Sequence, residues 1–161
     1  MYNSLEPSIK IFPSIRLFGY KTSMSLSNNL TASLWQKLMP QRADLPSSQP
    51  NVYYSVEEYE LDYFKSFDPA KSLTKWAAFP VSQTESPGDE LGELIIPAGQ
   101  YAVFRHKGAS TDVSNLYQYI FSQWLPQSRY QLAHRPHFAI MDEKYRKDDR
   151  NSEEDIYIPI D

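Results

Sequence analysis

Cysteine is absent from the 161-residue chain, so the sequence excludes disulfide bonds, thiolate nucleophiles and thiolate metal sites. Glycine is scarce, at five residues, and neither a Gly-rich phosphate loop nor a Gly-x-Ser-x-Gly nucleophile motif is present. No apolar run is long enough to span a bilayer, and the N-terminus lacks the pattern of a secretory signal. We therefore expect a cytoplasmic protein without a membrane segment, whose core needs no covalent cross-links.

Positive charge and histidine are also limited. The net charge is −4, and the Lys and Arg residues are dispersed along the chain, which argues against direct nucleic-acid binding. The three histidines are His106, His134 and His137, and no partner at ligand spacing supports a metal site. We expect neither a metal nor a cofactor.

Aromatic residues, by contrast, are abundant. They make up 14% of the chain, with 12 Tyr and 3 Trp. Tyr and Trp present a flat apolar face together with a polar edge. Such residues fill cores, and they also line cavities for flat or cationic ligands, so composition alone leaves both roles open.

The first half of the chain predicts a strand, a helix and two strands. Pro13 interrupts the first extended segment, and Gly19 indicates a close approach of another backbone. Ser27 is a suitable helix cap, and Pro40 is expected to end that helix. The predicted segments are a strand at 9–22, a helix at 28–39 and strands at 51–61 and 75–83.

The second half predicts the same order. Its first extended segment bends at Pro97, its helix is capped by Ser110 and carries a continuous apolar stripe, and Pro126 is expected to end it. The predicted segments are an extended stretch at 93–108, a helix at 111–125 and strands at 136–142 and 153–160.

An internal repeat links the two halves. LWQKLMPQ at 34–41 aligns with LYQYIFSQ at 116–123, an offset of 82 residues, and both segments occupy the helix position of their half. We predict an α+β fold of duplicated strand–helix–strand–strand halves, about 8–84 and 93–161, within one domain spanning 1–161. An antiparallel sheet with two main helices would leave a ligand groove between the halves.

Four segments resemble a known family: YAVFRHKG at 101–108, WLPQS at 124–128, RPHF at 135–138 and EEDIYIPI at 153–160. They are similar to GyrI-like domains, the effector-binding domains of AraC-type regulators and of multidrug-sensing MerR-class activators. The chain also resembles stand-alone cationic-drug-binding proteins encoded on integron gene cassettes. The resemblance implies the duplicated fold and an aromatic-lined cavity at the junction of the halves, where a buried carboxylate meets a lipophilic cation.

Two departures from the family pattern concern that carboxylate. The family often has Phe-Glu where this chain has Phe138-Ala139, and Gly-x-Glu-Val where it has Ala78-Phe79-Pro80-Val81. The negative partner of a cation must therefore come from elsewhere. Glu58 and Asp155 are the first candidates, and Glu57 and Glu60 are comparable.

Strand alternation assigns faces to the remaining candidates. Ile156, Ile158 and Ile160 should meet the helices, while Tyr157 and Ala139 should face the groove. Alternation does not decide which face of 52–60 turns inward. Each aromatic candidate has core packing as its alternative role, and each carboxylate a solvated strand end. The predicted ligand-binding residues are Trp35, Tyr54, Glu58, Trp76, Phe104, Tyr117, Ala139, Asp155 and Tyr157.

The leading function is the binding of amphipathic aromatic cations. The chain has no room for a helix-turn-helix of its own, so we expect it to sequester compounds or to signal through a protein partner such as a DNA-binding regulator. Two alternatives stay open at this point: a protein-interaction role like that of gyrase-inhibitor-like members, and hydrolysis of small electrophiles. Hydrolysis is disfavoured because Ala139 and Pro80 replace the usual catalytic carboxylates, and we expect no enzymatic activity.

Overall fold

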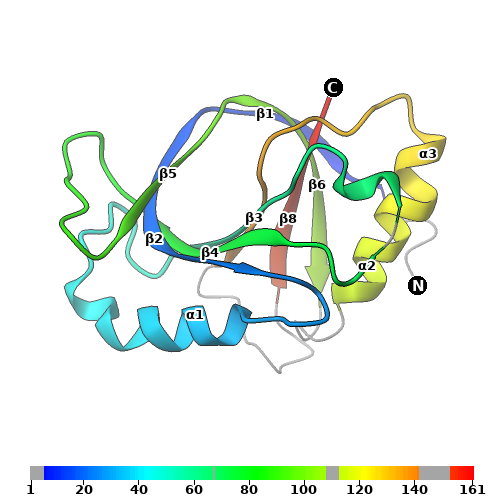
Figure 1. Cartoon of the computed structure of the whole chain (residues 1–161). Helices are drawn as coiled ribbons and strands as arrows, with labels where there is room; N and C mark the ends of the chain where they lie inside the picture. Colours follow the sequence, from blue (N-terminus) through cyan, green and yellow to red (C-terminus); the bar gives the residue numbers. More distant parts are fainter. Residues whose placement is uncertain (1–5, 67, 108–112, 142–152) are drawn as a thin grey trace.

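The computed structural model describes residues 6–66, 68–107, 113–141 and 153–161, which form one eight-stranded antiparallel sheet with helices beside it (Figure 1). Two extended runs, β1–β2 and β5–β6, arch across the molecule and curl the sheet. The strands are β1 (Ser8–Phe12), β2 (Ile15–Met24), β3 (Tyr53–Glu58), β4 (Leu73–Pro80), β5 (Gly92–Ile96), β6 (Gly99–Lys107), β7 (His137–Met141) and β8 (Glu153–Ile160). The helices are α1 (Thr31–Leu38), η1 (Met39–Asp44), η2 (Tyr63–Lys65), α2 (Val113–Tyr119), η4 (Ile120–Trp124) and α3 (Leu125–Gln127).

The strand order shows the duplication directly. It runs β1-β6-β8-β7-β3-β4-β2-β5, so the two halves are mirrored about the central β7–β3 pair. Each half contributes a strand, a helix and two strands, and the short strand that leads each half pairs with the other half instead: β1 with β6, and β5 with β2. The predicted α+β fold of two strand–helix–strand–strand halves is confirmed.

Cross-strand register separates the two faces of the sheet. Residues paired across neighbouring strands point to the same side. One continuous row of paired positions is Trp76, Val56, Phe138, Tyr157 and Val103, and it defines the inner face of the curl. A second row defines the outer face and consists of Tyr20, Ala77, Ser55, Ala139, Ile156 and Phe104.

The inner face is a packed core. The rings of Phe138 and Tyr157 stack with centroids 4.5 Å apart, and Tyr101 meets Phe138 edge-on at 5.4 Å. Tyr54 and Trp76 belong to the same cluster, and both are buried. Such ring pairs add about 0.5–1.5 kcal/mol each beyond the apolar area that they bury. Much of the aromatic excess therefore serves the interior of the curled sheet.

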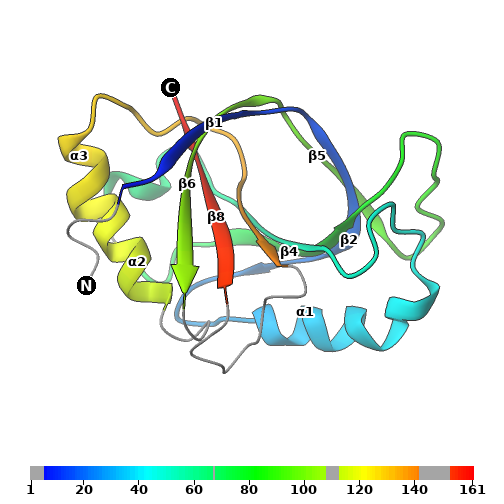
Figure 2. The ribbon, with the colours of Figure 1, turned by 180° about the vertical axis from the view of Figure 1, so that it is seen from behind.

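The helices cover the outer face. Leu34 and Leu38 of α1 pack against Phe18 and Phe79, at the end of the sheet formed by β2 and β4. Leu116 and Ile120, from the second helical run, belong to the cluster that contains Ile156, Ile158 and Ile160. Figure 2 shows the same arrangement from behind, with the two helical runs at opposite ends of the sheet. The prediction that the Ile-rich face of β8 meets the helices is confirmed.

The first helix differs from prediction at both ends. Ser27 is not its cap, because Ser25 and Asn28 close a turn there, and α1 begins only at Thr31, whose backbone N–H donates to Asn29 Oδ1 at 3.0 Å. Pro40 does not end the helical path either. It occupies the first turn of η1, where a missing N–H costs little.

The second helical run also continues past its proline. Pro126 lies in the first turn of α3, which follows the π-type turns of η4, so its missing N–H is again tolerated. The run ends after Gln127. The predicted cap Ser110 lies outside the described residues. No helix in the described ranges is long and apolar enough to cross a membrane.

The backbone of β4 approaches Gly19 of β2 closely, as the sequence predicted. A Cβ atom at Gly19 would overlap the carbonyl oxygen of Ala77 and lie 2.7 Å from the Cα of Ala78. We expect Gly19→Ala to lower the free energy of unfolding by about 1–3 kcal/mol, the usual cost of overpacking. Urea denaturation followed by circular dichroism measures the change. Ser23→Ala, at an exposed position of the same strand, is the control, and equal stability of the two variants would contradict the prediction.

Candidate functional site

The two halves meet at the β3–β7 pair, between the ends of the sheet that α1 and α2 cover. The outer-face residues of these strands form what we call the junction face: Tyr53, Ser55, Glu57, His137, Ala139 and Met141. Ser55 and Ala139 pair at its centre, with Ala77 next to Ser55 on β4. These short side chains give the junction face a low floor between two helices.

Aromatic rings from both helical runs approach the junction face. The Trp35 ring of α1 meets Tyr53 edge-on at 6.1 Å. From the other side, Tyr117 of α2 and Phe121 of η4 lie parallel to each other at 6.5 Å. Trp35 and Tyr117 are equivalent positions of the internal repeat, and the structure confirms that they lie on either side of the junction.

A wall of rings closes one end of the junction face. Phe64, from η2, stacks on Phe121 at 4.7 Å and on the His137 imidazole at 5.5 Å. Tyr59 contacts both Phe64 and His137, with ring centroids 4.8 Å away in each case. We call Tyr59, Tyr63, Phe64, Tyr117 and Phe121 the aromatic wall. Phe64 is 39% exposed, so this wall has a face in contact with solvent.

His137 is a buried polar residue of the junction face. It is 2% exposed, and its Nδ1 has no hydrogen-bond partner among the described residues. Burial penalises the imidazolium form and lowers the pKa of His137 to about 3. At physiological pH it therefore carries no charge that would repel a cation.

Glu57 supplies negative charge to the junction face. Its Oε2 forms an ion pair with Lys75, which lies opposite Glu57 on the neighbouring strand β4. Its Oε1 is buried and has no hydrogen-bond partner in the described parts of the chain. Burial first, and then the Glu57 charge, raises the pKa of Tyr59 and of Tyr117 well above the usual value. Both phenol groups therefore lie within electrostatic reach of the carboxylate, and both stay protonated.

The nine predicted ligand-binding residues divide between the two faces. The outer face has Trp35, Phe104, Tyr117 and Ala139, and the inner face has Tyr54, Glu58, Trp76, Asp155 and Tyr157. The expectation that Ala139 and Tyr157 share a groove is wrong, because Ala139 pairs with Ile156 and Tyr157 pairs with Phe138. Phe138 is indeed core, but it belongs to the inner core, so its neighbour Ala139 points towards the helices.

The two carboxylates named first as cation partners are engaged elsewhere. Glu58 accepts a hydrogen bond from the Trp76 indole N–H at 2.6 Å, and Asp155 pairs with Arg105 on β6. Neither lies on the junction face. Glu57 was only a comparable candidate in the sequence, although alternation does place it on one face with Tyr53, Ser55 and Tyr59. That grouping of a carboxylate with two tyrosines was the available signal.

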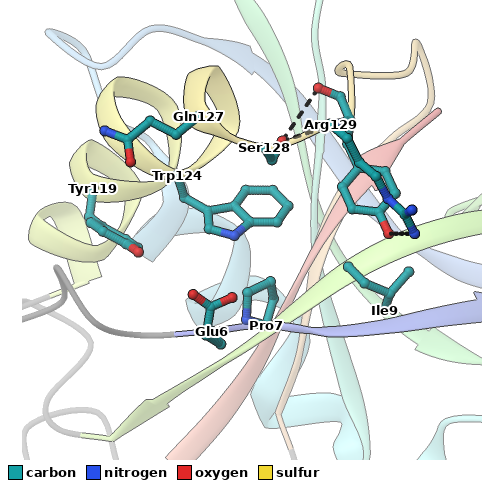
Figure 3. Close-up of a pocket in the computed structure, with 9 residues that line it drawn as sticks. Glu6, Pro7, Ile9, Tyr119, Trp124, Gln127, Ser128 and Arg129 are labelled. Carbon is teal, nitrogen blue, oxygen red and sulfur yellow. Dashed lines mark hydrogen bonds between the residues drawn. The ribbon is translucent and has the colours of Figure 1, made fainter.

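A separate cavity of about 440 Å³ lies on the opposite flank of the second helical run, where it meets the start of β1 (Figure 3). In the figure, Tyr119 and Trp124 point from the helix towards Glu6 and Pro7. This cavity lies at the edge of the sheet, beside β1, and away from the junction of the halves. Its other lining residues are Ile9, Gln127, Ser128, Arg129 and Tyr130. In the described ranges, no group of three His, Asp or Glu side chains is placed to hold a metal ion.

Comparison with known proteins connects this architecture to one family. Residues 5–161 match the model of the GyrI-like small molecule binding domain. The transcriptional regulator BrlR of Pseudomonas aeruginosa is 25% identical over 150 residues, which is 92% of this chain but 53% of BrlR, so the chain spans about half of that relative.

Two solved structures share the fold. SAV2435 bound to tetraphenylphosphonium superposes with a TM-score of 0.74 at 15% identity, covering 98% of this chain and 94% of SAV2435. An integron cassette protein from the mobile metagenome of Vibrio cholerae superposes with a TM-score of 0.67 at 15% identity, covering 97% and 96%. The resemblance to integron cassette proteins seen in the sequence is therefore matched in the fold.

The lowered pKa of His137 makes a pH prediction. Below pH 6.5 the unfolded chain binds a proton that the folded state does not accept until about pH 3, so stability falls as the pH drops through this window. Between pH 7 and pH 5, we expect this residue to remove about 2 kcal/mol from the free energy of unfolding. His137→Phe should lose that part of the decrease, while His134→Gln, at an exposed position, should keep it. Urea unfolding at both pH values measures the effect. If the free energy of unfolding of His137→Phe fell between pH 7 and pH 5 as much as that of the wild type, the prediction would be refuted.

Proposed function

Because a family model matches residues 5–161, the chain belongs to the GyrI-like small-molecule-binding domain family, and we propose that it binds amphipathic aromatic cations at the junction face. GyrI-like domains are ligand-binding modules. Within that class, the side chains of the junction face favour a ligand that combines positive charge with flat rings.

The observation that carries the proposal is Glu57 Oε1, which is buried and has no hydrogen-bond partner among the residues that the structure describes. A buried carboxylate oxygen without a partner lacks the hydrogen bonds that water would give it, which costs about 1–3 kcal/mol or more for a charged group. A ligand cation placed against this oxygen would recover part of that cost. A neutral ligand of the same shape would not, so the carboxylate selects for positive charge.

The surrounding rings supply the second requirement. Trp35 and Tyr53 flank the low floor from one side, and Tyr117 with Phe121 from the other. Ring faces attract cations by about 0.5–2 kcal/mol per contact, most strongly away from water. They also provide apolar area for the aromatic groups of the ligand. Charge from Glu57 and ring faces from both halves together fit a lipophilic cation.

Two relatives support the proposal without fixing the ligand. SAV2435 has the same fold and was solved with tetraphenylphosphonium, a lipophilic cation with four phenyl groups. BrlR is a transcriptional regulator about twice as long as the segment that it shares with this chain. We infer that ligand binding here could be transmitted to a DNA-binding regulator as partner. We do not extend the proposal to hydrolysis, since Ala139 and Pro80 cannot activate water.

Exchanging the charge of the ligand tests this proposal. Tetraphenylphosphonium and tetraphenylborate have the same shape and opposite charge, so their affinities separate charge recognition from apolar burial. We expect saturable binding of tetraphenylphosphonium below about 100 μM, and at least a tenfold loss in Glu57→Gln, equivalent to about 1.4 kcal/mol. Tetraphenylborate should bind to Glu57→Gln at least as tightly as to the wild type. Isothermal titration calorimetry measures both, with Glu60→Gln as the control for lost charge at an exposed position. Equal tetraphenylphosphonium affinity of Glu57→Gln and the wild type would refute the role of Glu57.

The three tryptophans allow the binding position to be mapped. Trp35 lies beside the junction face, Trp76 in the inner core and Trp124 at the separate cavity. We expect Trp35→Phe to lose most of the ligand-induced quenching of tryptophan fluorescence, and Trp124→Phe to keep it. The reverse result would place the ligand in the cavity of Figure 3 and contradict binding at the junction face.

A further inference from the structure

Lys75 is an unusual neighbour for a cation-binding carboxylate. It lies on β4, opposite Glu57 in the register, and only 7% of the residue is exposed. Lysine is rarely buried to this degree unless an anion pairs with it. Its ammonium contacts Glu57 Oε2, so a cation from the chain itself already pairs with the carboxylate of the junction face.

The geometry of this ion pair leaves it open to exchange. Lys75 engages one oxygen of the carboxylate and leaves Oε1 without a partner in the described part of the structure. An ammonium is a point charge on a flexible four-carbon stem, unlike the planar guanidinium of arginine, which binds both carboxylate oxygens at once. The flexible stem of Lys75 therefore favours an exchange of partners at Glu57 over a fixed, two-point contact.

The local charges also favour competition. Glu154 is a second carboxylate that the charge of Lys75 affects. Burial raises the pKa of Glu154, His106 lowers it, and of the two smaller effects Glu57 raises it and Lys75 lowers it. Tyr117 is coupled to both Glu57 and Glu154. The charge of Lys75 therefore acts on Glu154 as well as on its ion-pair partner Glu57, and His137 beside Glu57 is neutral.

We propose that Lys75 is a tethered competitor for the ligand cation, and that displacing its ammonium from Glu57 sets the affinity and the charge selectivity of the junction face. The inference rests on the proposed function. The ion pair with Lys75 compensates a buried carboxylate that would otherwise destabilise the fold. A ligand cation at Oε1 would lie beside the Lys75 ammonium on Oε2, and the two like charges would repel each other. The cation therefore gains only the difference between its own contact with Glu57 and that of Lys75, so the lysine lowers affinity.

Replacing Lys75 in two ways should shift affinity in opposite directions. Lys75→Met removes the competitor, and we expect tetraphenylphosphonium to bind at least tenfold more tightly and tetraphenylborate more weakly. Lys75→Arg strengthens the competitor by bidentate pairing, and tetraphenylphosphonium should bind at least threefold more weakly. Titration calorimetry on the full chain measures the affinities of the wild type, Lys75→Met and Lys75→Arg for these ligands. Lys10→Met, at an exposed position of β1, controls for the change in net charge.

The double variant Glu57→Gln/Lys75→Met checks that Lys75 acts through Glu57. We expect the gain from Lys75→Met to fall below threefold when Glu57 is absent, since the two residues would then be coupled. If Lys75→Met does not fold, Lys75→Arg retains the ion pair and still tests the direction of the effect.

The outcomes separate the two proposals. If the wild type binds tetraphenylphosphonium and Glu57→Gln weakens binding, but Lys75→Met binds no more tightly or Lys75→Arg no more weakly, competition by Lys75 is wrong and the proposed function stands. Failure of the wild type and of all variants to bind tetraphenylphosphonium overturns both. Opposite shifts in Lys75→Met and Lys75→Arg, absent in Lys10→Met, support the inference.

Discussion

The pairing of β3 with β7 is the constraint on which the rest of this structure depends. Five residue pairs join the two halves at the centre of the sheet, whereas the other pairings between the halves, β1 with β6 and β5 with β2, lie at the sheet edges. This register places Ser55 against Ala139 and Glu57 against His137. A slip of one residue would exchange the faces and turn Glu57 towards the inner core. The junction face is thus a property of one strand pairing, to which each half contributes three residues.

The curl of the sheet gives its two faces different tasks. The inner face is filled by stacked and edge-on rings, including Phe138 and Tyr157, and these rings hold the curl together. The outer face cannot be filled in the same way at its centre, because α1 and α2 cover opposite ends and short side chains occupy the middle. Apolar clusters therefore fill the inside of the curl and the two helix-covered ends of the outer face, and polar and charged groups lie on the junction face between them.

Local sequence signals predicted the elements well. The helical repeat, the order of strands and helices along the chain and the close approach at Gly19 all followed from periodicity and residue type. The proline and serine signals were less reliable: Pro40 and Pro126 begin new helical turns, and Ser27 belongs to a turn before the helix. Such residues are compatible with more than one position near a helix end, and the path of the neighbouring chain decides between them.

The site was harder to predict because both faces of the sheet are buried. Alternation correctly separated Phe138 from Ala139 and Glu57 from Glu58, but hydrophobicity did not show which set belonged to which face. Because the core was assigned to a single side of the sheet, Ala139 was predicted to face the same way as Tyr157, whereas it lies on the opposite face. The same assignment also drew Glu58 into the list, although its carboxylate accepts the hydrogen bond of Trp76 instead of facing the junction. In a fold with two cores, knowing that a residue is buried does not establish what it contacts.

Register also explains how Glu57 can supply a carboxylate close to position 139, where the family often has Glu and this chain has Ala139. Glu57 lies two residues from Ser55, the partner of Ala139, so the two positions are diagonal neighbours on one face. Such neighbours are about 7–8 Å apart, within the combined reach of a glutamate and a bound cation. Moving the charge to β3 brings it against β4, and there it meets Lys75. At the proposed site, a carboxylate on β3 therefore has Lys75 of β4 as its direct neighbour, whereas a carboxylate on β7 would not, because β7 does not border β4.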